Sequence, residues 1–549
     1  MNNSTSGISI PVDPATQHPE PRHLQNIRAT RREWSGLAVL TLPCLLLSMD
    51  LTVLYLAVPS LRADLNPSSA QLLWIVDIYG FLIAGSLITM GTLGDRIGRR
   101  RLLLIGGAAF AVASTLAAFS TSAEMLIATR GLLGVAGATL MPSTLALIRN
   151  MFHDPTQRST AISLWVTSFT VGNAIGPLLG GFMLERFWWG SVFLLGVPVM
   201  ALLLILGPVL LPENRDPDAG RLDVFSAALS LVAILAVIYG IKRMASDGIS
   251  GTSVLAIVAG FVLGLVFVLR QRKLRDPIID LELFRVPAFS TSVGTQLVAL
   301  IAIAGAYFFT VQYLQLVLGL SPLRAGLWLI PPTIAGMGGS MFAPVVARRI
   351  RPAVVMSGGL IMAAVGFAML TQVGGGGGLM ILLPAFVILS IGISATITIT
   401  TDLIMGVAPP DRAGAASAIS ETSCELGLAL GIAVIGSIGT AVYRLDMANA
   451  IPAGIPTEAA DAARDTLGGA LAVAARLAGQ LGTDLADVAR AAFVHALHTS
   501  AITGGVMVTV LAIVVILTLK QIPPRSGYRA LSLAVGNGGA GRGCGPPGA

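Results

Sequence analysis

The sequence predicts an all-α integral membrane protein, on three observations. Asp, Glu, Lys and Arg make up only 11% of the 549 residues, against roughly a quarter in proteins with a water-facing surface. Hydrophobic residues reach 54%, and the mean hydropathy is +0.81. These residues are gathered into runs of about 20, the length that crosses a bilayer as one helix. We therefore expect about fourteen transmembrane helices.

The apolar runs follow one another from near the start of the chain to near its end. They lie at about 36–58, 72–92, 102–120, 124–149, 160–184, 190–211, 222–241, 252–270, 289–318, 322–346, 353–373, 379–405, 413–441 and 499–521. The stretch between the last two runs is rich in alanine but carries too many charges to cross a membrane. We expect it to form an external helical hairpin at about 443–498.

An internal repeat predicts how these helices are grouped. Arg158 opens Arg-Ser-Thr-Ala-Ile-Ser, and Arg412, about 254 residues later, opens Arg-Ala-Gly-Ala-Ala-Ser. Two related halves with a site between them are typical of transporters. The expected divisions are a cytoplasmic tail (1–35), a six-helix half (36–211), two inserted transmembrane helices with linkers (212–288), a second six-helix half containing the hairpin (289–521) and a disordered cytoplasmic tail (522–549).

The basic residues predict the orientation in the membrane. If the N-terminus is cytoplasmic, most of the 35 Lys and Arg residues fall on cytoplasmic segments, as the positive-inside rule requires. We therefore expect a multi-pass protein of the cell (cytoplasmic) membrane with both termini in the cytoplasm. The isoelectric point of about 9.7 is then explained by topology, so no nucleic-acid partner is expected. We expect a monomer in the lipid bilayer.

The loop after the second predicted helix carries an ordered motif. It reads Gly91-Thr-Leu-Gly-Asp95-Arg96-Ile-Gly98-Arg99-Arg100-Arg101. A generic basic loop would explain the arginines but not Asp95 or the spacing of the glycines. Asp95 can sit against a helix N-terminus, where the helix dipole favours negative charge. The motif resembles the loop signature of the major facilitator superfamily.

Two further motifs are similar to one branch of that superfamily. The fifth predicted helix reads Gly172-Asn-Ala-Ile-Gly176-Pro177-Leu-Leu-Gly180-Gly181 and resembles the antiporter motif of drug:proton exporters. The run from Ser48 to Pro59 resembles the first helix of the fourteen-helix, QacA-like drug:proton antiporters, with Tyr55 in place of the usual asparagine. The resemblance implies the major facilitator fold, transport driven by the proton gradient and no cofactor.

Ionisable residues within the apolar runs are the candidates for coupling, because charge in a bilayer is costly and marks function. A carboxylate removed from water holds either a proton or a cation, which is the exclusivity that an antiporter needs. The resemblance implies that Asp50 and Glu425, with Arg130, couple transport to protons. It implies that Glu421, and with less support Asp77, contact cationic substrates. Two alternatives stay open: a solvated Asp77 at the membrane boundary, and an Arg130 that reaches towards its helix end.

Aromatic side chains are expected to line part of a substrate cavity, because their faces accept flat lipophilic cations loosely. Trp165, Phe169 and Tyr313 are the candidates, together with Tyr307 and Phe308. Each could contact lipid or the helix core instead. QacA-like exporters often carry an acid in the tenth helix that helps to bind divalent cations, but the predicted tenth helix here contains none between Arg324 and Val346. The resemblance therefore places efficient export of dications in doubt.

The function predicted is proton-coupled export of lipophilic, often cationic, drugs and toxic compounds. The alternative is export of one endogenous metabolite, antibiotic, siderophore or lipid-like molecule. An enzyme is not expected, since all five histidines lie in polar segments and the cysteines are far apart, so neither a metal site nor a nucleophile–base pair is available. The chain also lacks the GxxxxGK[ST] pattern for binding ATP phosphates.

Overall fold

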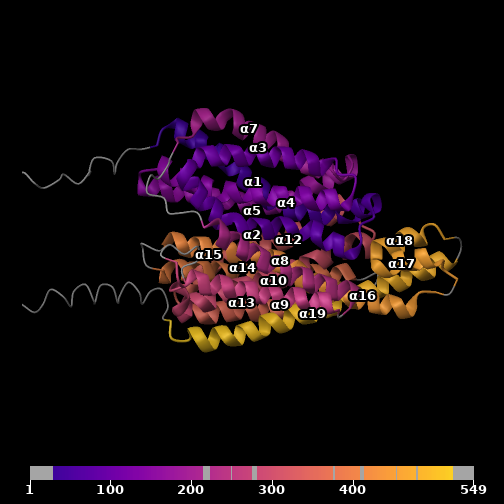
Figure 1. Ribbon diagram of the computed structural model, residues 1–549. Helices are drawn as coiled ribbons and strands as arrows, with labels where there is room; N and C mark the ends of the chain where they lie inside the picture. Colours follow the sequence, from indigo (N-terminus) through magenta and orange to yellow (C-terminus); the bar gives the residue numbers. More distant parts are fainter. Residues whose placement is uncertain are drawn as a thin grey trace, which may run out of the picture.

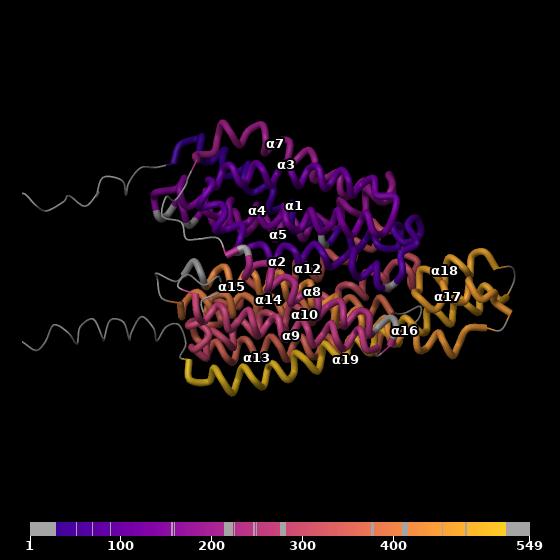
Figure 2. The backbone as a smooth tube through the Cα atoms, viewed as in Figure 1, coloured from indigo at the N-terminus to yellow at the C-terminus, as the bar shows by residue number. Residues whose placement is uncertain are grey.

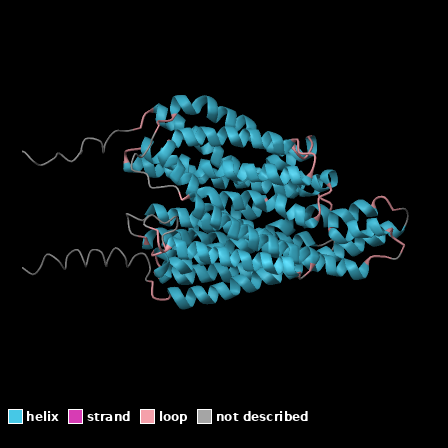
Figure 3. Ribbon diagram, viewed as in Figure 1, coloured by secondary structure: helices cyan, strands magenta, loops and turns pink. Residues whose placement is uncertain are grey.

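The computed structural model describes residues 29–213, 223–248, 250–274, 281–374, 378–408, 413–452, 454–477 and 480–522. Within these ranges every regular element is a helix (Figure 3). The predicted tails lie almost entirely outside the described residues, which take in only the end of the N-terminal tail, from residue 29, and Ile522 of the C-terminal one.

The helices gather into two bundles (Figures 1 and 2). The first bundle consists of α1 (Arg31–Leu65), α2 (Ser69–Ile97), α3 (Arg99–Ala118), α4 (Ala123–Met151), α5 (Pro155–Arg186), α6 (Ser191–Leu194) and α7 (Gly196–Leu210). The second contains η3 (Leu283–Arg285), α10 (Pro287–Gln312), η4 (Tyr313–Val317), α11 (Pro322–Trp328), α12 (Ile330–Ala347), α13 (Pro352–Leu370), α14 (Gly378–Val407), α15 (Ala413–Gly431), η6 (Ile432–Gly436), α16 (Ser437–Ala450), α17 (Thr457–Asp465), α18 (Leu467–Ala474) and α19 (Gln480–Leu519).

Two helices connect the bundles along the chain, α8 (Val224–Asp247) and α9 (Gly251–Gln271). The side chain of Asp223 caps the first turn of α8 by accepting from the backbone N–H of Ser226 at 3.0 Å, as its predicted place at a helix end suggests. Burial opposes ionisation of this carboxyl, but hydrogen bonds from Ser226 and the guanidinium of Arg270 outweigh burial and hold the pKa of Asp223 below its ordinary value.

The number of membrane-crossing helices confirms the predicted fold class. Among the described residues, thirteen helices are long and apolar enough to span, and fourteen if α1, bent by 44° at its middle, counts as one span. Large apolar side chains on their outer faces are exposed, such as Phe261 at 68% and Met341 at 73%. Water would not tolerate such surfaces over a whole molecule, whereas lipid does.

The predicted external hairpin differs from the structure in one respect. Its second arm is not a separate helix, because α19 runs unbroken for 40 residues from Gln480 to Leu519. No proline or glycine interrupts the chain between Thr483 and the apolar run, and the charges of Asp487 and Arg490 pair on the exposed face.

The start of α1 and the end of α19 lie at the same end of the molecule, hereafter the tail end, opposite the α17–α18 end (Figure 1).

Candidate transport site

A cavity of about 480 Å³ lies between the two bundles. It is lined by α1 and α5 from the first bundle, and by α10, α12, α14 and α15 from the second. Its lining residues are Thr52, Tyr55, Thr170, Asn173, Leu300, Ile303, Ala304, Tyr307, Pro332, Thr333, Gly336, Met337, Ser340, Phe386, Ser390, Ile393, Ser394, Ile397, Thr398 and Leu428. A cavity of this size holds a drug-sized molecule.

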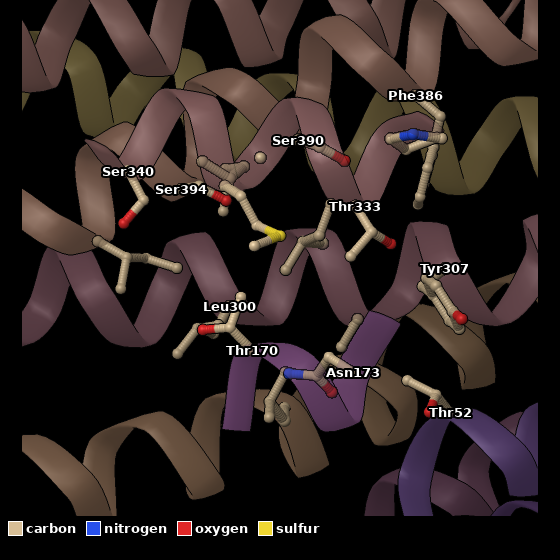
Figure 4. A pocket seen from close by; sticks show the side chains of 18 of the residues that line it. Thr52, Thr170, Asn173, Leu300, Tyr307, Thr333, Ser340, Phe386, Ser390 and Ser394 are labelled. Carbon is tan, nitrogen blue, oxygen red and sulfur yellow. The ribbon is translucent and has the colours of Figure 1, made fainter. Parts of the chain in front are cut away.

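The cavity is neutral, since none of these described lining residues carries a charge. Hydroxyl groups and an amide supply its polarity, and Figure 4 shows several of these side chains around the cavity. Three aromatic rings stand in a row at one side: Tyr55 and Tyr307 have centroids 5.2 Å apart, and Tyr307 and Phe386 are 6.0 Å apart. Aromatic faces attract cations and also contact neutral flat molecules.

Asp50 and Arg130, predicted to act together, form an ion pair inside the first bundle between α1 and α4. Arg130 is completely buried, so it does not reach towards its helix end. Its Nε donates to the carbonyl oxygen of Ile75 at 3.2 Å, and its guanidinium lies 4.5 Å from the centroid of the Tyr79 ring. The carboxylate of Asp50, the carbonyl oxygen of Ile75 and the ring of Tyr79 thus surround the buried cation and offset part of its loss of water.

Asp77 lies away from the cavity and faces α8 instead. Its Oδ2 is 2.8 Å from Nζ of Lys242, and the two side chains are 0% and 1% exposed. The ammonium also lies 4.3 Å from the centroid of the Trp74 ring. The partner of Asp77 in this conformation is therefore a lysine of the protein, and neither substrate contact nor solvation at the boundary describes its surroundings.

Glu421 and Glu425 lie on α15, on the side of the cavity nearer the tail end. Leu428, which lines the cavity, follows them by seven and three residues, so the three share one helix face. Both glutamates are partly exposed, and neither forms an ion pair with a described residue. These carboxylates continue the cavity face towards the tail end.

Three aromatic residues predicted to bind substrate are used in helix packing. Trp165 is buried and donates its Nε1–H to Oγ1 of Thr144 at 3.0 Å, with Phe169 edge-on at 4.9 Å. The hydroxyl of Tyr313 donates to the carbonyl oxygen of Gly374 at 2.6 Å. None of the three lines the cavity. Its aromatic residues are Tyr55, Phe386 and Tyr307, of which Tyr307 was predicted to line it.

The loop motif joins α2 to α3 through a conformation that requires glycine. Gly98 has φ of +110°, and a Cβ there would lie 2.5 Å from a carboxylate oxygen of Glu213. Asp95 pairs with Arg99 in the first turn of α3, at 2.5 Å between Oδ1 and Nη2. Arg100 donates to the carbonyl oxygen of Leu211 at 3.0 Å, beyond the end of α7, so the basic loop caps a neighbouring helix.

The two remaining motif positions have ordinary surroundings. Gly91 faces Pro142 of α4 at 3.8 Å from the position of a Cβ, and Arg96 is partly exposed at the end of α2.

The glycines of the fifth-helix motif allow two different close contacts. A Cβ at Gly172, Gly176 or Gly180 would collide with α1, the last at 2.8 Å from Val53. Gly181 instead faces the second bundle, where a Cβ would lie 2.6 Å from Cα of Leu323 on α11. Small residues permit such approach in membranes. The motif therefore packs α5 within its own bundle and also seats it against the other.

The contact of α5 with α11 is one of several that close the seam between the bundles towards the α17–α18 end. In another, α2 packs against α15 and η6: a Cβ at Gly80 would lie 3.1 Å from Cβ of Ala429, and one at Gly436 would lie 3.0 Å from the side chain of Leu73. Pro177 of the motif belongs to the contact of α5 with α11, because its carbonyl faces Gly326 of α11.

Sequence reasoning missed the polar face of α14 and the lysine of α8. Ser390, Ser394 and Thr398 recur every four residues within an apolar run, and this spacing places them on one helix face. That pattern could have located the cavity. Lys242 lies beyond the predicted span 222–241, but α8 continues to Asp247 and carries the lysine inside the protein.

Comparisons with known proteins agree with this architecture. The model of the Major Facilitator Superfamily matches residues 41–432. The chain is 45% identical over 488 residues to the multidrug efflux pump LfrA of Mycolicibacterium smegmatis, covering 89% of this chain and 96% of that protein. It is 34% identical to the methyl viologen resistance protein SmvA of Salmonella typhimurium, covering 88% and 97% of the two chains. A tetracenomycin C resistance and export protein of Streptomyces glaucescens is 30% identical, with 92% and 96% covered.

Solved structures show the same fold at lower sequence identity. A bacterial homologue of the human lysosomal transporter Spinster, crystallised in an inward-facing, unoccupied conformation, matches with a TM-score of 0.65 at 17% identity, over 90% of this chain and 98% of that one. With the match to the family model, the bundles and the cavity between them, the chain belongs to the major facilitator superfamily and is a multi-pass membrane transporter.

Proposed function

We propose that this transporter is a proton-coupled antiporter that exports lipophilic, often cationic, small molecules from the cytoplasm. The observation that carries the proposal is a neutral, aromatic and hydroxyl-lined cavity between the bundles, with the carboxylates of Asp50, Glu421 and Glu425 on helices that line it but outside its lining. The names of the relatives, a multidrug efflux pump and a methyl viologen resistance protein, support export of such compounds.

The cavity suits substrates that differ in shape but share apolar surface. Tyr55, Tyr307 and Phe386 offer ring faces, and hydroxyls such as Ser390 can donate to or accept from a polar group of the substrate. No charged residue is among the described residues that line the cavity, so within the cavity itself discrimination rests on size and hydrophobicity. Pockets of this kind bind many related molecules with moderate affinity.

The carboxylates provide the proposed route for protons. Asp50 holds Arg130 by an ion pair, and neutralising Asp50 with a proton would free the buried guanidinium to change partners. Such a change couples protonation to a movement of α1 against α4. Glu425, on the cavity face of α15, is the proposed second proton site, and Glu421 beside it is the proposed contact for an entering cation. We propose that the proton gradient alone drives transport, without a cofactor, and that the protein acts as a monomer.

The orientation proposed places the tail end in the cytoplasm. The basic loops 96–101 and 348–351 lie at the ends of helices on that side, as the positive-inside rule demands. The conformation described here is closed between the bundles at the α17–α18 end, which becomes the external end.

A second candidate is export of an antibiotic that the producing cell makes itself. The relative named for tetracenomycin C resistance and export favours this candidate. The same cavity would serve, so substrate range separates the two: one good substrate among many poor ones indicates a dedicated exporter.

The test is efflux of ethidium from cells that express the protein, with and without a protonophore. We expect efflux to stop when the proton gradient collapses and to be lost in Asp50→Asn, which keeps the size of the side chain but cannot exchange a proton. Asp461→Asn is the matched control, since Asp461 is an exposed residue of α17 that pairs with its neighbour Arg464. Normal uphill export by a well-expressed Asp50→Asn protein would contradict the coupling role. Absence of efflux in the folded parent would favour the dedicated exporter.

A further inference from the structure

The helix α8 covers the seam between the two bundles. Ile234, Leu235 and Ile238 of α8 pack in one apolar cluster with Phe81 of α2 and with Ala429 and its neighbours on α15 and η6. The helix therefore contacts the first bundle through α2 and the second through η6 and α16. Any movement that parts α2 from α15 must also break contacts with α8.

Lys242 and Asp77 form a charged contact between α8 and α2. A buried ion pair is weak evidence for stability, because apolar side chains of similar volume would pack there without desolvating two charges. Charges kept at membrane depth mark function by default. The ring of Trp74, 4.3 Å from the ammonium, holds Lys242 from the side of α2 as well. The pair thus ties α8 to α2 at the place where α2 meets the other bundle.

A second cavity, of about 370 Å³, gives access to this pair from the α17–α18 end. Lys242 and Trp74 line it, together with Tyr239, Arg243, Arg444 and Asp465. Its lining is polar and it is separate from the central cavity. Water in this space can solvate the ammonium of Lys242 when it leaves Asp77. The pair can therefore open without leaving a charge stranded in an apolar surrounding, which would otherwise be prohibitive.

We propose that Lys242 and Asp77 form a latch by which α8 holds the transporter closed at the α17–α18 end. While the pair is made, α8 clasps α2 over its contact with α15, and the seam at Leu73 and Gly436 stays shut. When the pair opens, α2 is free to part from α15 and the α17–α18 end opens. The inference rests on the proposed transport function. It gives α8 a role in the transport cycle, in which Lys242 is a positioning residue.

The test measures opening of the seam by chemical labelling. Leu73, buried at 3% exposure against Gly436, is replaced by cysteine in a protein whose Cys44, Cys424 and Cys544 are changed to alanine. A membrane-impermeant maleimide added at the α17–α18 side reacts with this cysteine only when the seam opens. The rate is compared among the parent, Asp77→Asn/Lys242→Met, which removes both charges together, and the charge swap Asp77→Lys/Lys242→Asp.

We expect the neutral double variant to react about tenfold faster than the parent, within the range typical of conformational coupling. The charge swap should return the rate close to that of the parent, which a merely structural site would not predict. The matched control is Asp223→Asn/Arg270→Met, which removes a 3.2 Å ion pair between the tail-end start of α8 and α9; its rate should stay unchanged.

A double variant that reacts at the parent rate would overturn the latch, and so would a charge swap that reacts as fast as the neutral variant. Neither single variant is needed, so an unpaired buried charge that prevents folding does not obscure the result. Labelling requires no drug and no gradient. A protein that exports no ethidium but shows the expected rates keeps the latch and loses the proposed substrate class.

Discussion

Adding one methyl group at Gly181 should shift the transporter away from the conformation that is closed at the α17–α18 end. In Gly181→Ala the new Cβ would lie 2.6 Å from Cα and 2.9 Å from the backbone N of Leu323. These are backbone atoms of α11, so no side chain can rotate away, and α5 and α11 must separate by about 1 Å to reach ordinary contact. Overpacking of this kind costs about 1–3 kcal/mol.

That penalty applies only while the two bundles touch at this point, so it acts on the equilibrium between closed and open forms. A difference of about 1–3 kcal/mol corresponds to a shift of about 5- to 150-fold towards the open form. The assay is maleimide labelling of Leu73→Cys from the α17–α18 side, with ethidium efflux measured in parallel. Labelling should accelerate within this range, and efflux should slow because the cycle must pass through the closed state.

Two glycine variants serve as controls. Gly264→Ala on α9 meets no atom within 4 Å, so it should leave labelling and efflux unchanged. Gly180→Ala meets Val53 of the same bundle at 2.8 Å and should lower thermal stability without accelerating labelling. If Gly181→Ala labels and exports like the parent, the contact between α5 and α11 does not close the transporter and the reasoning fails.

Three further predictions concern charge. Glu421→Gln should reduce export of monocations such as tetraphenylphosphonium several-fold while sparing neutral substrates, and equal losses for both would contradict a role in cation contact. Because no described acid lines the cavity, methyl viologen, a dication, should be exported more slowly than ethidium in the same vesicles, and faster export would point to a carboxylate that reaches the substrate in another conformation. Asp223→Ala should lower stability in detergent at neutral pH by about 1 kcal/mol, through loss of an N-cap. Folding lowers the pKa of Asp223, so the stability that its charge contributes is present above the ordinary carboxylate pKa and fades as pH falls through the pKa of the folded protein. The thermal unfolding temperatures of parent and variant should therefore converge in acid.

The sequence by itself determined that the helices lie in lipid rather than in water, and it determined the fold. Hydropathy summed over about 20 residues distinguishes lipid from water whatever each helix packs against. A motif such as that from Gly91 to Arg101 can be recognised because all of its residues are contiguous in the sequence. The same reasoning singled out Asp50 and Arg130, since a charge within an apolar run needs a partner, and their pairing is found in the structure.

The tertiary structure alone decided which side chains face the cavity. Trp165 and Tyr313 suit a drug pocket by residue type, but the rotation of their helices directs them into packing, while Ser390 and Phe386 line the space. Asp77 required a partner that could not be identified from its own helix, because Lys242 lies some 165 positions further along the chain at the end of another helix. Composition records how apolar a helix is, whereas the direction of each side chain depends on the neighbours against which that helix comes to rest.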